Sequence, residues 1–258
     1  MKGRLRRMTR RIPLAAMSAL LLAGACGGGS TGRSSPGTRA SPSVAPTPSA
    51  PQLVETHSVL FPGETYTTPD FVPRITFTVR DPWWVQNEDA TSIILNPGTS
   101  DQPEENVVIL NVERVFEPSN QRVPVKAPKD LVAWFRRHPG IKFIVKPHPV
   151  EIGGVRGSEF DVEPFKPPLC EENPNLPPGL RCWLIAPFRP GDPFSPAEAA
   201  MGPPLLIGTT DRGTPERTRI DVVDIQGHHV LISFGDYPDS FGSTVRLFEQ
   251  LIQTIRFG

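Results

Sequence analysis

Three cysteines are the first candidates for chemistry in this chain, and they divide into one single residue and one pair. Cys170 and Cys182 lie within and just beyond a proline-rich stretch. In an exported protein, two cysteines at this spacing favour a disulfide, which would close a loop of about 13 residues and contribute on the order of 3 kcal/mol of stability. The alternative, a metal site, lacks a nearby histidine or a second cysteine pair, so we expect no metal and no cofactor.

The adjacent pair His228 and His229 is a second candidate, in a segment that alternates like a β-strand. Neighbouring strand residues point to opposite faces, so the two imidazoles cannot bind one metal ion together. Either histidine could form a dyad with Asp221 or Asp224 across a hairpin, although a solvated or hydrogen-bonded strand histidine is the commoner outcome. A hydrolase also needs a poised nucleophile, but residues 53–258 contain no Gly-x-Ser-x-Gly elbow, and Ser158 lies in a strand context. We therefore predict no catalytic residue.

Trp83 and Trp84 form the most aromatic pair in the sequence and offer a third candidate, a surface on which a ligand could stack. Adjacent strand positions would place one indole inward and the other outward. Core packing for one ring and surface contact for the other is the simpler expectation. With His228 and His229, these two residues make up our candidate ligand surface.

The N-terminal segment predicts export. Residues 12–25 are apolar and small, apart from Pro13 and Ser18. The run of about 14 residues is shorter than the roughly 20 that a membrane-spanning helix requires. A basic start followed by a short apolar run is typical of a secretory signal peptide. The basic residues that precede the run, with no acid among them, are Lys2, Arg4, Arg6, Arg7, Arg10 and Arg11.

Residues 21–26, Leu-Leu-Ala-Gly-Ala-Cys, resemble the lipobox of bacterial lipoproteins. The resemblance implies that Cys26 receives a diacylglyceryl group and becomes the mature N-terminus, which would anchor the protein to the outer face of the bacterial cell membrane. Ala23 departs from the leucine that is commonest at that position of the family. The alternative is ordinary cleavage after residues 23–25, which would leave Cys26 as a free thiol in an oxidising compartment.

Residues 27–52 predict a disordered linker, because they are almost wholly Gly, Ser, Thr, Pro and Ala. The chain therefore divides into a signal peptide (1–25), a lipidated cysteine with its linker (26–52) and a single globular domain (53–258), here called the head. The head holds 19 Lys and Arg against 27 Asp and Glu, a balance of −8. Such a charge gives no reason to expect nucleic-acid binding.

Alternating and helical patterns predict an α+β head, with a mainly antiparallel β-sheet flanked by two amphipathic helices. We expect one long strand at 106–116, two short strands at 141–145 and 150–152, and a helix of about three turns at 127–138. The clearest features are a hairpin, 217–225 with 228–234, and a final amphipathic helix near 243–254. A further turn of helix is predicted at 196–201.

Three segments, residues 75–84, 150–154 and 220–257, together resemble the PsbP-like superfamily of α/β/α sandwiches, and particularly its exported lipoprotein branch, similar to the mycobacterial LpqN group. The superfamily has no common catalytic residues, so the resemblance implies a binding or accessory role toward a protein or small-molecule ligand. The insertion that carries Cys170 and Cys182 departs from the usual plan. We thus expect a lipid-anchored, non-catalytic envelope protein. The alternative is an exported hydrolase that uses a dyad of His228 or His229.

Overall fold

The computed structural model describes residues 50–99, 106–170, 179–187, 205–209 and 213–258, and the structural statements below concern these residues. All of the described residues belong to one compact unit, Pro48–Gly258. The predicted signal peptide, Cys26 and most of the predicted linker lie outside the described part, as does the helical turn predicted at 196–201.

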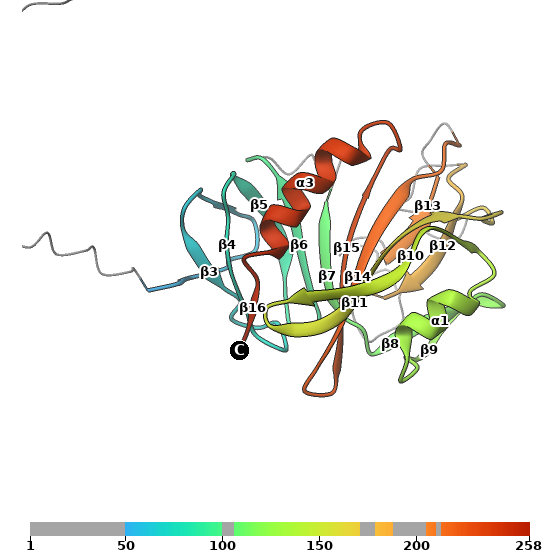
Figure 1. Ribbon diagram of the computed structural model, residues 1–258, viewed down its shortest axis with the longest axis horizontal. Helices are drawn as coiled ribbons and strands as arrows, with labels where there is room; N and C mark the ends of the chain where they lie inside the picture. The colour runs from blue at the N-terminus through green and yellow to red at the C-terminus, as the bar shows by residue number, and fades with distance from the viewer. Residues whose placement is uncertain (1–49, 100–105, 171–178, 188–204, 210–212) are drawn as a thin grey trace, which may run out of the picture. The chain divides into compact units, whose positions relative to one another are not determined.

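An eight-stranded antiparallel sheet forms the centre of the head (Figure 1). In spatial order its strands are β10 (Ile141–Ile152), β11 (Val155–Pro164), β14 (Arg217–Ile225), β15 (His228–Asp236), β7 (Val107–Asn111), β6 (Ser92–Pro97), β5 (Trp83–Glu88) and β2 (Ser58–Leu60). The predicted α+β class, with mainly β structure, is confirmed.

Three smaller groups of strands accompany this large sheet. A four-stranded sheet joins β1 (Gln52–Leu53), β3 (Thr65–Thr67), β4 (Ile75–Thr78) and β16 (Arg256–Phe257). Two separate hairpin-like pairs are formed by β8 (Arg114–Glu117) with β9 (Asn120–Lys126), and by β12 (Cys182–Ala186) with β13 (Leu205–Gly208).

The described residues contain two helices, α1 (Leu131–Arg137) and α3 (Phe241–Ile252). α1 is shorter than the three turns that we predicted, because Asp130 already ends the extended segment and caps the helix by accepting a hydrogen bond from the Ala133 backbone at 2.7 Å. α3 begins at Phe241, slightly before the predicted start. Neither helix in the described part is long and apolar enough to cross a membrane.

The hydrophobic core occupies both faces of the large sheet. Along β7, Val107 packs in the same cluster as Phe248 of α3, whereas the next residue, Val108, packs with Phe135 of α1. Successive strand residues point to opposite faces, so the two clusters lie on opposite sides of the sheet. We call these sides the α3 face and the α1 face. Because both are buried, the central strands are continuous apolar runs rather than strict alternations.

The C-terminal hairpin follows the predicted pairing, with Ile225 opposite His228 and Arg217 opposite Asp236. Its two turn residues, Gln226 and Gly227, both have positive φ, at 52° and 89°. Positive φ at both central positions is the conformation of a type I′ turn, which suits the twist of the flanking strands.

Two strand predictions are wrong. Residues 106–116 form not one strand but two, β7 and β8, which belong to different sheets. Conversely, 141–152 form one long strand, β10, although Pro147 and Pro149 lie inside it. β10 is the edge strand of the large sheet, and an edge strand tolerates residues that have no N–H to donate.

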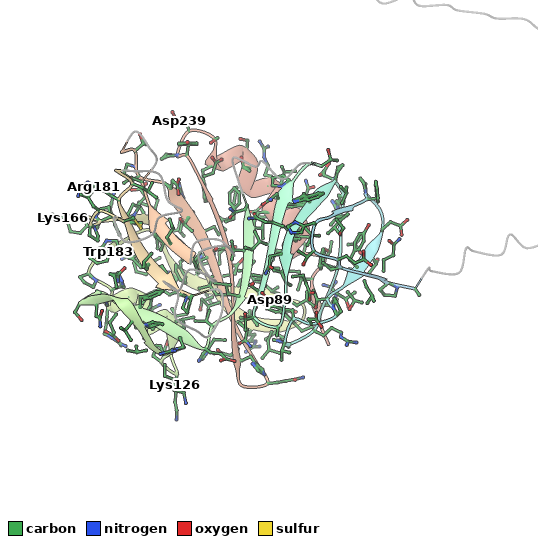
Figure 2. All side chains as sticks on the ribbon, turned by 180° about the vertical axis from the view of Figure 1, so that it is seen from behind. Asp89, Lys126, Lys166, Arg181, Trp183 and Asp239 are labelled. Atoms are coloured by element: carbon green, nitrogen blue, oxygen red, sulfur yellow. A yellow bond between two sulfur atoms is a disulfide. The ribbon has the colours of Figure 1, made fainter. Side chains whose placement is uncertain are left out.

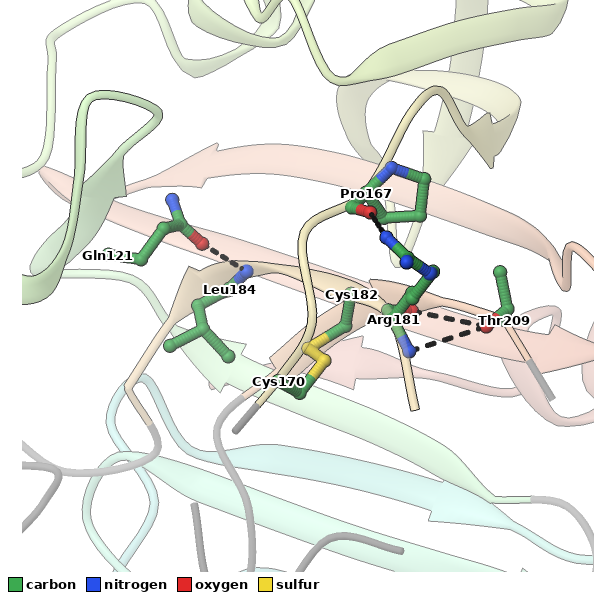
Figure 3. The surroundings of a disulfide bond; sticks show 7 residues. All are labelled: Gln121, Pro167, Cys170, Arg181, Cys182, Leu184 and Thr209. Carbon is green, nitrogen blue, oxygen red and sulfur yellow. Dashed lines mark hydrogen bonds between the residues drawn. A yellow bond between two sulfur atoms is a disulfide. The ribbon is translucent and has the colours of Figure 1, made fainter. Parts of the chain in front are cut away.

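The predicted disulfide between Cys170 and Cys182 is present (Figure 3). Cys182 is buried at the start of β12 and packs in a small cluster with Phe116 and Leu184. Gln121 Oε1 accepts a hydrogen bond from the Leu184 backbone at 2.6 Å, which joins β9 to the same strand. The disulfide therefore attaches the preceding proline-rich segment to the β12–β13 pair.

Candidate functional site

A polar hollow of about 560 Å³ opens beside α1, on the α1 face of the large sheet. Its size lies within the range of small-molecule pockets. Cations enter it from three parts of the chain: Lys129 before α1, Arg136 on α1 and Arg156 on β11. Ser158 and Asp224 line the same space, and we refer to it below as the hollow.

The local sequence explains how α1 contributes to the hollow. Leu131 and Phe135 are buried against the sheet, which turns the other side of the helix outward. Val132 and Arg136 are four residues apart and therefore share that side. The buried pair anchors the helix, and Arg136 stays exposed at the hollow.

β11 and β14 form the other wall. Arg156 and Ser158 alternate with Gly157 and therefore lie on one side of β11, the side that faces the hollow. Gly157 is required here because a Cβ atom would come within 2.4 Å of the Val222 carbonyl oxygen. The two strands approach closely at this glycine, which places Arg156 and Asp224 on adjacent strands at one end of the site.

The three cations of the hollow have no partner among the described residues, whereas its two acids are already engaged. Asp130 caps α1, and Asp224 Oδ1 pairs with Nδ1 of His229. No ion pair within the described part of the chain involves Lys129, Arg136 or Arg156. The hollow therefore contains three cations and two acids, a formal balance of +1, and none of the three cations forms an ion pair with a described residue.

The structure places the two candidate histidines in different surroundings. His229 lies on the α1 face and contacts Asp224, so one version of the predicted dyad exists. His228 lies on the other face, where its Nδ1 is 3.1 Å from the side-chain nitrogen of Asn111. Asp221 belongs to neither contact. Ser158 lines the hollow near Asp224, but no hydrogen bond joins it to His229 among the described contacts.

The tryptophan pair divides as expected for adjacent strand positions. Trp83 is buried in the core of the α3 face. Trp84 is half-buried, with its ring centroid 6.3 Å from that of His57, and its buried Nε1 has no hydrogen-bond partner in the described part of the structure. The two rings do not form a joint platform, and they are not gathered with the histidines at one site.

A buried charge network lies on the α3 face, and the sequence analysis missed it. Asp161 of β11 is fully buried and accepts hydrogen bonds from Arg217 at 2.5 Å and Arg219 at 2.8 Å. Arg219 also donates to Glu249 of α3 at 2.7 Å. The guanidinium carbon of Arg217 lies 4.6 Å from the ring centroid of Phe241, a cation–π contact. These contacts attach α3 to the sheet.

Asp221 adjoins the same network but has no partner in it. Its side chain is 1% exposed, and neither carboxylate oxygen has a hydrogen-bond partner among the described residues. Burial raises the pKa of this carboxyl well above its usual range, and the nearby charge of Glu159 raises it further, while Arg219 acts in the opposite direction. The protein therefore favours the protonated form of Asp221.

His138 is a buried histidine at the end of α1, on the opposite side of the sheet from Asp221. Its ring packs edge-on against Trp134 and Trp183, with centroid distances of 5.1 and 5.4 Å. Trp183 is labelled in Figure 2. Nδ1 of His138 accepts a hydrogen bond from the Gly140 backbone at 3.1 Å. Because an accepting Nδ1 carries no proton, this contact requires the neutral imidazole. Burial lowers the pKa of His138 to about 4.

Within the residues that the structure describes, no group of three or more His, Cys, Asp or Glu side chains is arranged to hold a metal ion. A scan against protein-family models finds no match to this chain, and a search of curated proteins finds none either.

Proposed function

We propose that this chain is an exported bacterial lipoprotein whose head is a non-catalytic binding or accessory module at the outer face of the cell membrane. One observation carries the membrane attachment: a leucine-rich apolar run of signal-peptide length that ends on Cys26. Two or more acyl chains give stable membrane attachment, whereas a single chain gives only reversible binding. The linker then spaces the head from the lipid surface.

The hollow supports a binding role for the head. It is large enough for a small ligand and lies on rigid elements, a capped helix and two paired strands. Its three cations lack partners among the described residues, and a charge that the fold does not use for its own stability is available for a ligand. Exposed cationic groups near a shared space favour recognition of an anionic partner.

The PsbP-like resemblance remains part of this proposal. A mid-chain helix, a long hairpin and a final helix occur in the described structure in the order that the resemblance implies. The layers differ in detail, since strands of the smaller sheets share the two faces with the helices. The accessory role that the superfamily suggests agrees with a head that binds rather than reacts.

Replacement of the anchoring cysteine tests the proposal. We expect the Cys26→Ser variant, expressed in a bacterial host, to leave the membrane fraction or to accumulate as the unprocessed precursor. The matched control is Gly27→Ser, which changes the next residue and should remain membrane-bound after processing. Mass spectrometry of the mature N-terminus adds a direct readout. An unmodified Cys26, or the same membrane partition for Cys26→Ser, would contradict the lipid anchor.

An exported hydrolase is the second candidate function, and the contact between His229 and Asp224 beside the hollow favours it. Ser158 is the serine that lines the same hollow. If the three act together, the protein should hydrolyse an activated ester such as p-nitrophenyl acetate, and Ser158→Ala and His229→Gln should each abolish the activity. Equal background rates for the wild type and both variants would eliminate this dyad as a hydrolytic centre.

A further inference from the structure

We propose that the hollow is a binding site for a phosphate-type group, meaning a tetrahedral anion or the terminal phosphate of a larger molecule, held by Lys129, Arg136 and Arg156. This inference deepens the proposed binding function and rests on it. Three cations line the hollow, and none of them has an ion-pair partner among the described residues.

The three cations come from three separate places in the sequence yet line one space. The head is acidic overall, with a balance of −8, whereas the hollow has three cations against two acids, a balance of +1. The charge network on the α3 face shows what this fold does with cations that serve stability, because Arg217 and Arg219 there are each paired with Asp161. In contrast, the cations of the hollow are left for an external anion.

The arrangement favours a phosphate-type group over a carboxylate. A carboxylate has two oxygens in one plane and is matched by a single guanidinium fork. A phosphate has at least three free oxygens in a tetrahedral arrangement, which can accept from donors on several sides. Arg136, Arg156 and Lys129 approach from α1, β11 and the turn before α1, which are such separate sides.

The remaining groups of the hollow fit the same ligand. Ser158 can donate its hydroxyl to a phosphate oxygen. Asp130 and Asp224 also line the hollow, but both are engaged within the protein, Asp130 with the Ala133 backbone and Asp224 with His229, and the three cations outnumber them. We expect binding to weaken as salt concentration rises, because the three cations are exposed.

The test measures binding to the full chain, purified in a neutral detergent. Isothermal titration with inorganic phosphate and with glycerol 3-phosphate examines a soluble source of the group. Titration with micelles of the same detergent, with and without phosphatidic acid, examines a lipid headgroup as the source, because the acyl anchor already lies in a micelle in both cases. The variants are Arg136→Gln and Arg156→Gln, alone and together. Arg246→Gln on exposed α3 is the matched control, since it removes one cation far from the hollow in sequence.

We expect each substitution in the hollow to weaken binding by about tenfold, as for the loss of one charge-assisted hydrogen bond, and the double variant to bind undetectably. Arg246→Gln should bind as the wild type. Saturable binding of either soluble probe assigns a soluble ligand, and a binding signal only with micelles that contain phosphatidic acid assigns a headgroup. Binding of a soluble probe or of the headgroup supports the inference if the Arg136→Gln, Arg156→Gln double variant no longer shows that binding.

Absence of binding to every probe, or equal binding by the double variant, would overturn the inference. These results leave the lipid anchor untouched, because fractionation of Cys26→Ser tests the anchor independently. Release of inorganic phosphate from glycerol 3-phosphate would contradict the non-catalytic role while leaving the anion site in place. The failures of the two proposals are therefore distinguishable.

Discussion

The two faces of the large sheet use charge in opposite ways. On the α3 face, Arg217 and Arg219 are partly buried and bound to Asp161, which is fully buried. On the α1 face, Arg136 and Arg156 are exposed and have no ion-pair partner among the described residues. The same residue type thus attaches a helix on one side and lines an open hollow on the other. The arginines of the two faces differ in whether an acidic side chain pairs with them, and the residue type alone does not show this.

The largest expected effect comes from removing the acid at the centre of the α3-face network. We expect Asp161→Ala to lower the free energy of unfolding by about 3–5 kcal/mol, because two arginines lose the buried carboxylate that pairs with both. Urea denaturation measures the change. Asp239→Ala, an exposed acid just before α3, is the control and should stay within about 0.5 kcal/mol of the wild type. Equal unfolding free energies for the two variants would contradict a stabilising role for the Asp161 network on the α3 face.

His138 supplies a pH-dependent difference on the α1 face. Its folded pKa of about 4 lies below its ordinary value of 6.5, so the unfolded chain binds the proton first as the pH falls. Stability should therefore decline from pH 6.5 toward pH 4, by about 2–3 kcal/mol from this residue. His138→Asn keeps an acceptor for the Gly140 backbone but cannot titrate. Its unfolding free energy, measured by urea denaturation across this range, should decline less steeply, and a slope identical to that of the wild type would contradict the assignment.

Asp221 should produce the opposite pH response on the α3 face. Its folded pKa is raised above the unfolded value, so stability is fully present below the unfolded pKa and is lost as the pH rises toward the folded pKa. Asp221→Asn removes the ionisation. We expect this variant to be about 1–3 kcal/mol more stable than the wild type near pH 7, and nearly equal to it near pH 4. A destabilised variant at pH 7 would show that the carboxylate is satisfied after all.

The smallest expected effect concerns the stability of the hollow. Because Arg136 and Arg156 pair with nothing in the described structure, Arg136→Gln and Arg156→Gln should change the unfolding free energy by no more than about 0.5 kcal/mol. Thermal denaturation of both variants, with Asp161→Ala as the reference, measures the comparison directly. A loss near that of Asp161→Ala would mean that these arginines support the fold, which would remove the main argument for a ligand.

The sequence predicts the hairpin and the α+β class correctly, because both follow from residues that are neighbours in the chain. The hairpin around Gln226 and Gly227 follows from two alternating runs and a turn that needs positive φ, and the α+β class follows from the sum of such segments. β10 was mispredicted because its prolines normally interrupt strands, and only the tertiary position at a sheet edge permits them. The division of 106–116 between two sheets likewise depends on distant pairing.

The sites were harder to predict because their members are far apart in sequence. Arg217, Arg219 and Asp221 alternate along β14 and share a face, but Asp161 and Glu249, the partners of the two arginines, lie on β11 and α3, far away in the sequence. The cations of the hollow are separated by up to 27 positions, between Lys129 and Arg156, with nothing in the sequence to relate them. Of the catalytic candidates, the contact of His229 with Asp224 could be named in advance because both lie on one hairpin.

The two edge strands of the large sheet affect how readily copies of the protein associate when they are concentrated. One is β10, which lacks N–H donors at Pro147 and Pro149, and the other is β2, which has only three residues. Exposed edges are where one copy of a β-rich protein can recruit another by continuing its hydrogen-bond ladder. The two prolines of β10 and the short length of β2 both make such pairing between copies less favourable. If the proposed lipid anchor holds copies of the head side by side, these two edges should limit fibril-like association between them.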